Sequence, residues 1–156
     1  MKTKQLRERY ALSMYNSILK NVEKETGTAS TYSNDLDRIA KQKLGIAFKG
    51  VFASDRIPHL NSIYKYAILN LDSSTESGSH WIAIAHDYDK NITYCYDSFG
   101  RKNTQIIPNL KVSGNGRVID SDKDVEQNIK EENCGARSLA WLIFFELYGS
   151  KASLLI

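Results

Sequence analysis

The chain is poor in cysteine and histidine, with two cysteines and three histidines among its 156 residues. Two cysteines cannot form the disulfide framework of a small secreted domain, and a catalytic thiol favours a reducing compartment such as the cytosol or nucleus. Neither CxxC nor HxxxH spacing occurs, which argues against a zinc site. Any thiol or imidazole chemistry must therefore use this short set of residues.

A long hydrophobic run is also missing. The longest apolar stretch, Leu139–Phe145, is far too short to span a bilayer, and the charged N-terminus lacks the apolar core of a signal peptide. We therefore expect neither secretion nor a membrane partner. Hydrophobic residues make up 42% and charged residues 25% of the chain, values typical of a globular protein. This composition favours a compact enzyme with one catalytic domain.

The net charge of +3 is concentrated at one end of the chain. Residues 1–33 hold six Lys or Arg and three Asp or Glu, whereas residues 34–156 hold fifteen of each. Apolar side chains recur there at four-residue steps: Leu6, Tyr10, Met14, Ile18 and Val22. This pattern predicts a basic amphipathic helix from about Lys4 to Lys24, then a linker over Gly27–Ser33. The helix could pack on a catalytic domain formed by residues 34–156, or bind nucleic acid weakly.

The next hundred residues predict one helix and several strands. Asn34 as N-cap and Gly45 beyond the end delimit the helix. We expect strands at Tyr66–Leu71, Trp81–Ala85, Ile92–Tyr96 and Arg117–Asp120. Turn formers over Asp87–Asn91 predict a hairpin between the second and third of these strands. Residues 72–79 predict a polar surface loop.

Cys134 precedes a segment that is apolar on nearly every face, Gly135–Tyr148. Such a segment predicts a central, buried helix with the cysteine in its first turn. The unpaired backbone N–H groups there carry partial positive charge, which favours thiolate over thiol. Since thiolate is the nucleophilic form, Cys134 is the candidate nucleophile.

The predicted hairpin brings His80, at the start of one strand, beside Asp97, at the end of the next. A general base of this kind needs a carboxylate to fix its tautomer and stabilise the imidazolium. Gln127 lies seven residues before Cys134. Its amide could donate to a developing oxyanion together with the backbone N–H of Cys134.

Each of these residues also has an ordinary structural interpretation. A lone cysteine before an apolar helix is often a buried small side chain. A histidine at a strand start can simply satisfy a local hydrogen bond, and an aspartate beside serine and glycine is often a turn residue. The joint pattern of four residue types therefore carries the hypothesis.

The other candidates lack partners at suitable spacing. Cys95 lies in the middle of a predicted strand and is interpreted as packing. His59 and His86 have no matching partner signature. Asp87 and Asp89 fit a solvated hairpin turn better than a metal site, so no metal is expected.

The order His80, Asp97, Gln127, Cys134 resembles the adenovirus maturation protease family, within the wider group that includes SUMO-deconjugating cysteine proteases. The residues that carry the resemblance are His80-Trp81, Asp97, and Gln127 followed after six residues by Cys134-Gly135. The seventeen-residue step from histidine to acid and the seven-residue step from glutamine to cysteine are similar to the adenoviral branch. The likeness covers about residues 34–148.

The resemblance implies an α+β fold of the circularly permuted papain-like, adenain-like type, with a central mixed or antiparallel sheet packed on the Cys134 helix. It implies a cysteine endopeptidase that cleaves viral precursor proteins after small residues such as glycine during virion maturation. The implied location is the virion and the infected host cell. Alternatives on the same scaffold are a ubiquitin-like-protein deconjugase or an acetyltransferase effector, and a non-catalytic binding module also stays open.

No cofactor is expected from the residues themselves. The resemblance implies possible activation by DNA and by a peptide joined through a disulfide. The chain departs from that pattern, because its only cysteine besides Cys134 is Cys95 on a predicted strand.

Overall fold

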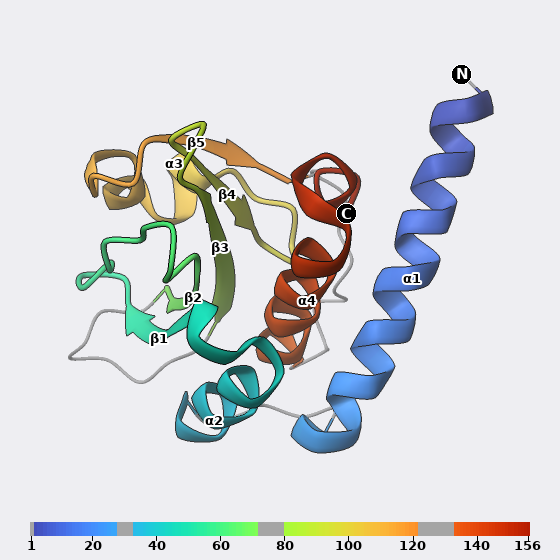
Figure 1. Cartoon of the computed structure of the whole chain (residues 1–156), viewed down its shortest axis with the longest axis horizontal. Helices are drawn as coiled ribbons and strands as arrows, with labels where there is room; N and C mark the ends of the chain where they lie inside the picture. The colour runs from blue at the N-terminus through green and yellow to red at the C-terminus, as the bar shows by residue number, and fades with distance from the viewer. Residues whose placement is uncertain (1, 28–32, 72–79, 122–132) are drawn as a thin grey trace.

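The computed structural model describes residues 2–27, 33–71, 80–121 and 133–156 (Figure 1). Its helices are α1 (Lys2–Thr26), α2 (Ser33–Leu44), α3 (Asn103–Ile106) and α4 (Cys134–Ser153), with short 3₁₀ helices at Gly45–Ala47 and Pro108–Val112. Its strands are β1 (Phe48–Ala53), β2 (Tyr66–Asn70), β3 (Trp81–Asp87), β4 (Ile92–Tyr96) and β5 (Arg117–Asp120).

The five strands form one mixed sheet in the order β1-β2-β3-β4-β5. β1 and β2 are parallel, β3 is antiparallel to both β2 and β4, and β5 is parallel to β4. The β3–β4 pair is the predicted hairpin, and its turn contains Asn91 at a φ of 53°. The α+β fold with a mixed central sheet is therefore confirmed.

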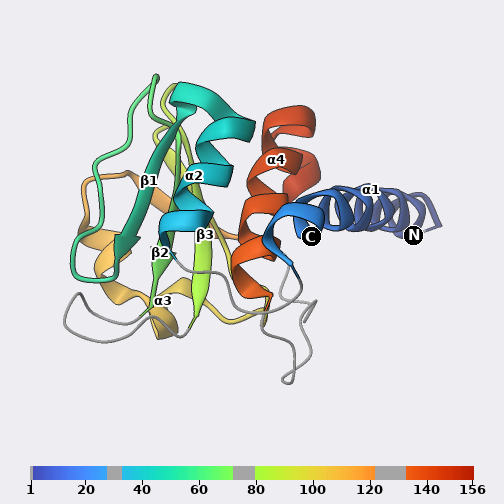
Figure 2. The ribbon, with the colours of Figure 1, turned by 90° about the horizontal axis from the view of Figure 1, so that it is seen from below.

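The sheet separates two apolar clusters, because successive strand residues point to opposite faces. Ala83, Ala85 and Tyr96 belong to the cluster that includes α4, α1 and α2. Ile84 and Cys95 belong to the smaller cluster on the other face. Figures 1 and 2 show α4 between the sheet and α1. α4 therefore lies in the centre of the larger core.

α4 is buried along its first three turns, as predicted, but not to its end. Buried side chains continue to Phe144, and the sheet meets the helix again through Phe145, whose ring packs on Tyr66 and Tyr94. Leu147 and Tyr148 are 61% and 44% exposed. The prediction of a helix buried throughout Gly135–Tyr148 is therefore wrong for its last turn.

α1 forms the predicted N-terminal helix with nearly the predicted bounds, but its buried stripe agrees with the predicted one only toward the C-terminal end, at Val22 and the partly buried Ile18. The buried side chains are Ala11, Tyr15, Leu19 and Val22. Leu6, Tyr10 and Met14 of the predicted stripe are exposed. The N-terminal end of α1 projects from the molecule (Figure 2), and α1 packs mainly on α4. Contact with α4 therefore determines which side chains of α1 are covered.

The remaining predictions differ in outcome. α2 begins at Ser33, one residue before the predicted cap, and Gly45 follows its end at a φ of 66°. The strand β1 was not predicted, because Gly50 interrupts its pattern where the pairing with β2 is irregular. Most of the predicted linker (28–32) and the predicted loop 72–79 lie outside the described residues. The boundary between residues 33 and 34 stays a prediction.

No helix in the described part of the chain combines the length and apolar character that crossing a membrane requires.

Candidate active site

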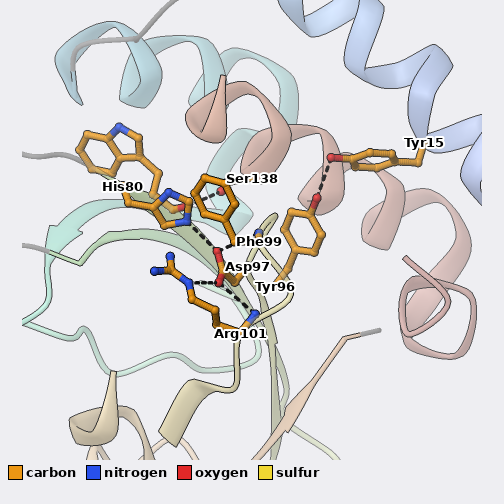
Figure 3. Close-up of polar contacts among 8 residues, drawn as sticks. Tyr15, His80, Tyr96, Asp97, Phe99, Arg101 and Ser138 are labelled. Carbon is orange, nitrogen blue, oxygen red and sulfur yellow. Dashed lines mark hydrogen bonds and ion pairs between the residues drawn. The ribbon is translucent and has the colours of Figure 1, made fainter. Parts of the chain in front are cut away.

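The hairpin brings His80 and Asp97 into direct contact. His80 directly precedes β3 and Asp97 directly follows β4, and the antiparallel pairing of Ala83 with Tyr96 aligns these two ends. The Nε2 atom of His80 lies 2.6 Å from Oδ1 of Asp97 (Figure 3). Both residues are buried. The sequence-based prediction that they meet is therefore what the structure shows.

Asp97 is surrounded by hydrogen-bond donors on both carboxylate oxygens. Oδ1 accepts from His80 and, at 3.3 Å, from the backbone N–H of Phe99. Oδ2 accepts from Nε of Arg101 at 2.8 Å and from its backbone N–H at 3.2 Å. Burial raises the pKa of Asp97, but the bonds from His80 and Arg101 outweigh it and lower this pKa to about 2. Asp97 is therefore a carboxylate at neutral pH.

Phe99 and Arg101 extend this arrangement in a way that the sequence analysis missed. The Phe99 ring stacks on the His80 ring with centroids 4.8 Å apart. The guanidinium of Arg101 lies 5.2 Å from the centroid of the Phe99 ring. The only sequence signal for these two residues was a glycine turn after the predicted strand. In the structure Gly100, at a φ of 69°, reverses the chain direction so that Arg101 reaches Asp97.

Cys134 completes the group from the start of α4. Its side chain is a hydrogen-bonding and electrostatic partner of the His80 ring that helps to raise the pKa of His80, and the residue is buried. Because Nε2 of His80 is bonded to Asp97, Nδ1 is the ring nitrogen left for the thiol. Burial lowers the pKa of His80, but the bonds to Asp97 and Cys134 together outweigh it, so this pKa lies above its ordinary value.

Packing at the start of α4 fixes the position of the thiol. A Cβ atom added at Gly135 would lie 3.2 Å from Leu36 and 3.4 Å from the Trp81 ring. Glycine therefore allows the helix to approach the residue directly after His80. Farther along, Oγ of Ser138 donates to the Trp81 carbonyl at 3.2 Å (Figure 3). Trp81 is 7% exposed, so it belongs to the core and braces the helix start.

Among the described residues, the N-cap residue of α4 does not bond the first turn through its side chain. Asn133 precedes it, but makes no cap hydrogen bond to the helix amides. Its Oδ1 atom instead accepts from Nε of Arg137 at 3.2 Å. The helix therefore presents backbone N–H groups and partial positive charge beside the Cys134 thiol.

The second cysteine lies elsewhere. Cys95 is a free, buried thiol on the opposite face of the sheet, and burial raises its pKa. His86 hydrogen-bonds Thr93 at 2.8 Å, and Thr93 donates to the Asn115 carbonyl at 2.6 Å. These contacts give His86 a structural role in the hairpin, in agreement with its ordinary interpretation.

Gln127 lies outside the described residues, so its role in the site stays a prediction. Across residues 2–27, 33–71, 80–121 and 133–156, no cluster of three His, Cys, Asp or Glu side chains could hold a metal ion.

A comparison with protein families adds independent information. Residues 48–152, well over half of the chain, match the adenovirus endoprotease family. His80, Asp97 and Cys134 all lie within this match. No curated protein matches the chain. The chain therefore belongs to the adenovirus endoprotease family, which makes it a viral cysteine protease of the maturation type.

Proposed function

We propose that the chain is a cysteine endopeptidase in which Cys134 is the nucleophile, His80 the general acid and base, and Asp97 the orienting carboxylate. The observation that carries the proposal is the double contact of the His80 ring, with Asp97 on Nε2 and the Cys134 thiol as its second partner. A nucleophile bonded to a base that is itself oriented by a third group is the arrangement of covalent acyl transfer.

In the first step the Cys134 sulfur attacks the carbonyl carbon of the scissile peptide bond, and the thiol proton resides on His80. The tetrahedral intermediate collapses as His80 donates that proton to the leaving amine, which produces a thioester on Cys134. His80 then takes a proton from water, which attacks the thioester and releases the acid product and the free thiol. The ionised Asp97 stabilises the imidazolium in both steps.

The oxyanion of each tetrahedral intermediate requires hydrogen-bond donors in place before the reaction. The position of Cys134 at the start of α4, where Asn133 makes no cap hydrogen bond, supports the Cys134 backbone N–H as one donor. Gln127 is proposed as the second, on the basis of its position seven residues before Cys134 and the order of the four residues. Removing such a donor costs about 10²- to 10³-fold in kcat, so Gln127→Ala should lower kcat by that factor.

Viral precursor proteins are the proposed substrates, cut after small residues such as glycine, inside the virion and the infected cell. Family membership supports the viral substrate class. The residue preference rests on the family resemblance. No resident cofactor is proposed.

Activation by a disulfide-linked peptide is not part of the proposal. Cys95 is 2% exposed in the cluster on the far side of the sheet. Burial also raises the pKa of its thiol, which disfavours disulfide exchange. Any activating peptide or DNA would therefore act by non-covalent binding.

Cleavage of fluorogenic peptides that contain Gly-Gly tests the proposal. The wild type should cleave them, and Cys134→Ala should abolish turnover. Cys95→Ala is the matched control, because it removes the other thiol and should keep turnover within a few-fold. Ubiquitin-like conjugates serve as a second substrate set. Turnover that survives Cys134→Ala, or wild type that cleaves only the conjugates, would contradict the proposed endopeptidase.

A further inference from the structure

α1 carries two apolar stripes, and the fold covers only one of them. The stripe of Ala11, Tyr15, Leu19 and Val22 is buried against the core. The second stripe remains open, with Leu6, Tyr10 and Met14 exposed by 53%, 65% and 45%. Large apolar side chains at regular helical spacing that stay in solvent mark a binding surface more often than isolated ones do.

The open stripe borders a groove between the N-terminal half of α1 and the C-terminal end of α4. This groove has a volume of about 820 Å³. Its apolar and aromatic lining comes from both helices and from one residue just beyond α4: Tyr10, Ala11, Met14, Phe144, Tyr148 and Leu155. Tyr148 is fourteen residues after Cys134, about 21 Å along α4 at the rise of a helix. The groove is therefore separate from the candidate active site.

Cationic side chains surround this apolar floor. Lys4 and Arg7 of α1 and Lys151 of α4 line the groove, and no acidic residue is among its described lining residues. Lys4 also lies 4.0 Å from Glu8, but both side chains are exposed, and such pairs contribute little. The groove therefore combines an apolar centre with a positive rim.

We propose that this groove binds an acidic, amphipathic helical segment of a partner protein. The apolar side chains of that segment fill the floor, and its carboxylates pair with Lys4, Arg7 and Lys151. Recognition of this kind, in which an amphipathic helix lies in an apolar groove, needs anchors at helical spacing and a complementary rim. The open stripe from Leu6 to Met14 matches two to three turns of such a segment.

Charge argues against the other occupants. A second copy docked through the same surface would bring the same cations together, because residues 1–14 contain four Lys or Arg and one Glu. The phosphates of a nucleic acid would pair with the cations. They would give the apolar side chains of the floor no apolar partner. An acidic peptide satisfies both the floor and the rim.

Fluorescence anisotropy with the full chain tests the proposal. The probe is a labelled 15-residue helical peptide with leucine at positions i, i+3, i+4 and i+7 and glutamate elsewhere, without glycine. A second peptide replaces every glutamate with lysine. We expect the glutamate peptide to bind at least tenfold more tightly. Met14→Glu and Arg7→Glu should each weaken its binding at least tenfold.

Leu12→Glu is the matched control. Leu12 is 41% exposed on the same helix but does not line the groove, so its replacement should leave binding unchanged. Circular dichroism checks that each variant keeps its helices. Equal binding of the two peptides, or equal losses in Met14→Glu and Leu12→Glu, would overturn the proposal. So would a DNA duplex that binds with the same sensitivity to Met14→Glu, or a dimer in sedimentation that Met14→Glu dissociates.

Discussion

The two ends of α4 differ in how deeply their side chains are buried and in how many partners they have. At its start, Cys134 and Gly135 lie against His80 and Trp81, and the neighbouring carboxylate of Asp97 has donors on both oxygens. Toward its other end, just before a break in the helix at Gly149, Leu147 and Tyr148 are exposed beside an open groove. One helix thus joins a closed polar site to an open apolar surface.

This difference indicates where the chain can tolerate change. A buried, hydrogen-bonded group holds its partners in place, and removal of one member leaves the others unpaired in a low-dielectric site. An exposed apolar side chain contributes little to folding. Substitutions at the first end should therefore affect chemistry and stability, and those at the second end should affect binding alone.

The largest expected effect is on catalysis. Asp97→Asn preserves the size of the side chain but removes the charge that stabilises a protonated His80, so kcat should fall about 10³-fold. Steady-state cleavage of a Gly-Gly peptide measures this fall. Asp87→Asn, at the other end of the same hairpin, is the control and should change kcat less than twofold. Comparable losses of kcat in both variants would contradict a catalytic role for Asp97.

The next largest effect is on the free energy of unfolding, which substitutions at the two ends of α4 should change by different amounts. Leu139 is fully buried, and Leu139→Ala should lower the free energy of unfolding by about 3 kcal/mol. Leu147 is 61% exposed, and Leu147→Ala should lower it by less than about 0.5 kcal/mol. Urea unfolding followed by circular dichroism gives both values. Similar losses would contradict the contrast between the two ends.

Acid should weaken the closed end selectively. The pKa of Asp97 is about 2 in the folded chain, against about 3.9 in an unfolded one. The folded state thus binds fewer protons, and the stability that Asp97 contributes is present above about pH 4 and lost as the pH falls toward 2. Comparing wild type with Asp97→Asn in urea should show a difference that shrinks by about 2 kcal/mol across this range. A difference independent of pH would be inconsistent with a paired carboxylate.

Arg101 tests whether the carboxylate must also be positioned. Arg101→Ala removes the Nε bond to Asp97 and the contact with Phe99. It should lower kcat about tenfold with little change in KM, because Arg101 acts through Asp97. Arg101→Lys should restore part of the loss, and Arg117→Ala, an exposed arginine on β5, should cost nothing. A raised KM with unchanged kcat would instead place Arg101 in substrate binding.

The sequence predicted the parts of this molecule that depend on local pattern. The β3–β4 hairpin follows from turn formers between two apolar runs, and its register determines that His80 and Asp97 meet. The buried first turns of α4 follow from an apolar run too dense for a surface helix. These features require no knowledge of distant contacts.

Other features depend on packing between distant segments. α1 has apolar residues on two sides of the helix. Contact with α4 and the Tyr15–Tyr96 hydrogen bond of 2.7 Å (Figure 3) determine which side is buried. Arg101 and Phe99 likewise gain their places from a turn whose geometry is not evident in the sequence. Periodicity predicts that a helix is amphipathic, whereas tertiary contacts decide which side is covered.

The central claim is that Cys134 and His80 form a proton-sharing pair, and the rate of iodoacetamide alkylation tests it most directly. An ordinary thiol, with a pKa of about 8.5, reacts slowly at about pH 6.5. At that pH, mass spectrometry of the wild type should show Cys134 alkylated at least tenfold faster than in His80→Gln, with Cys95 unmodified in both. Equal rates at Cys134 in the two proteins would contradict the account.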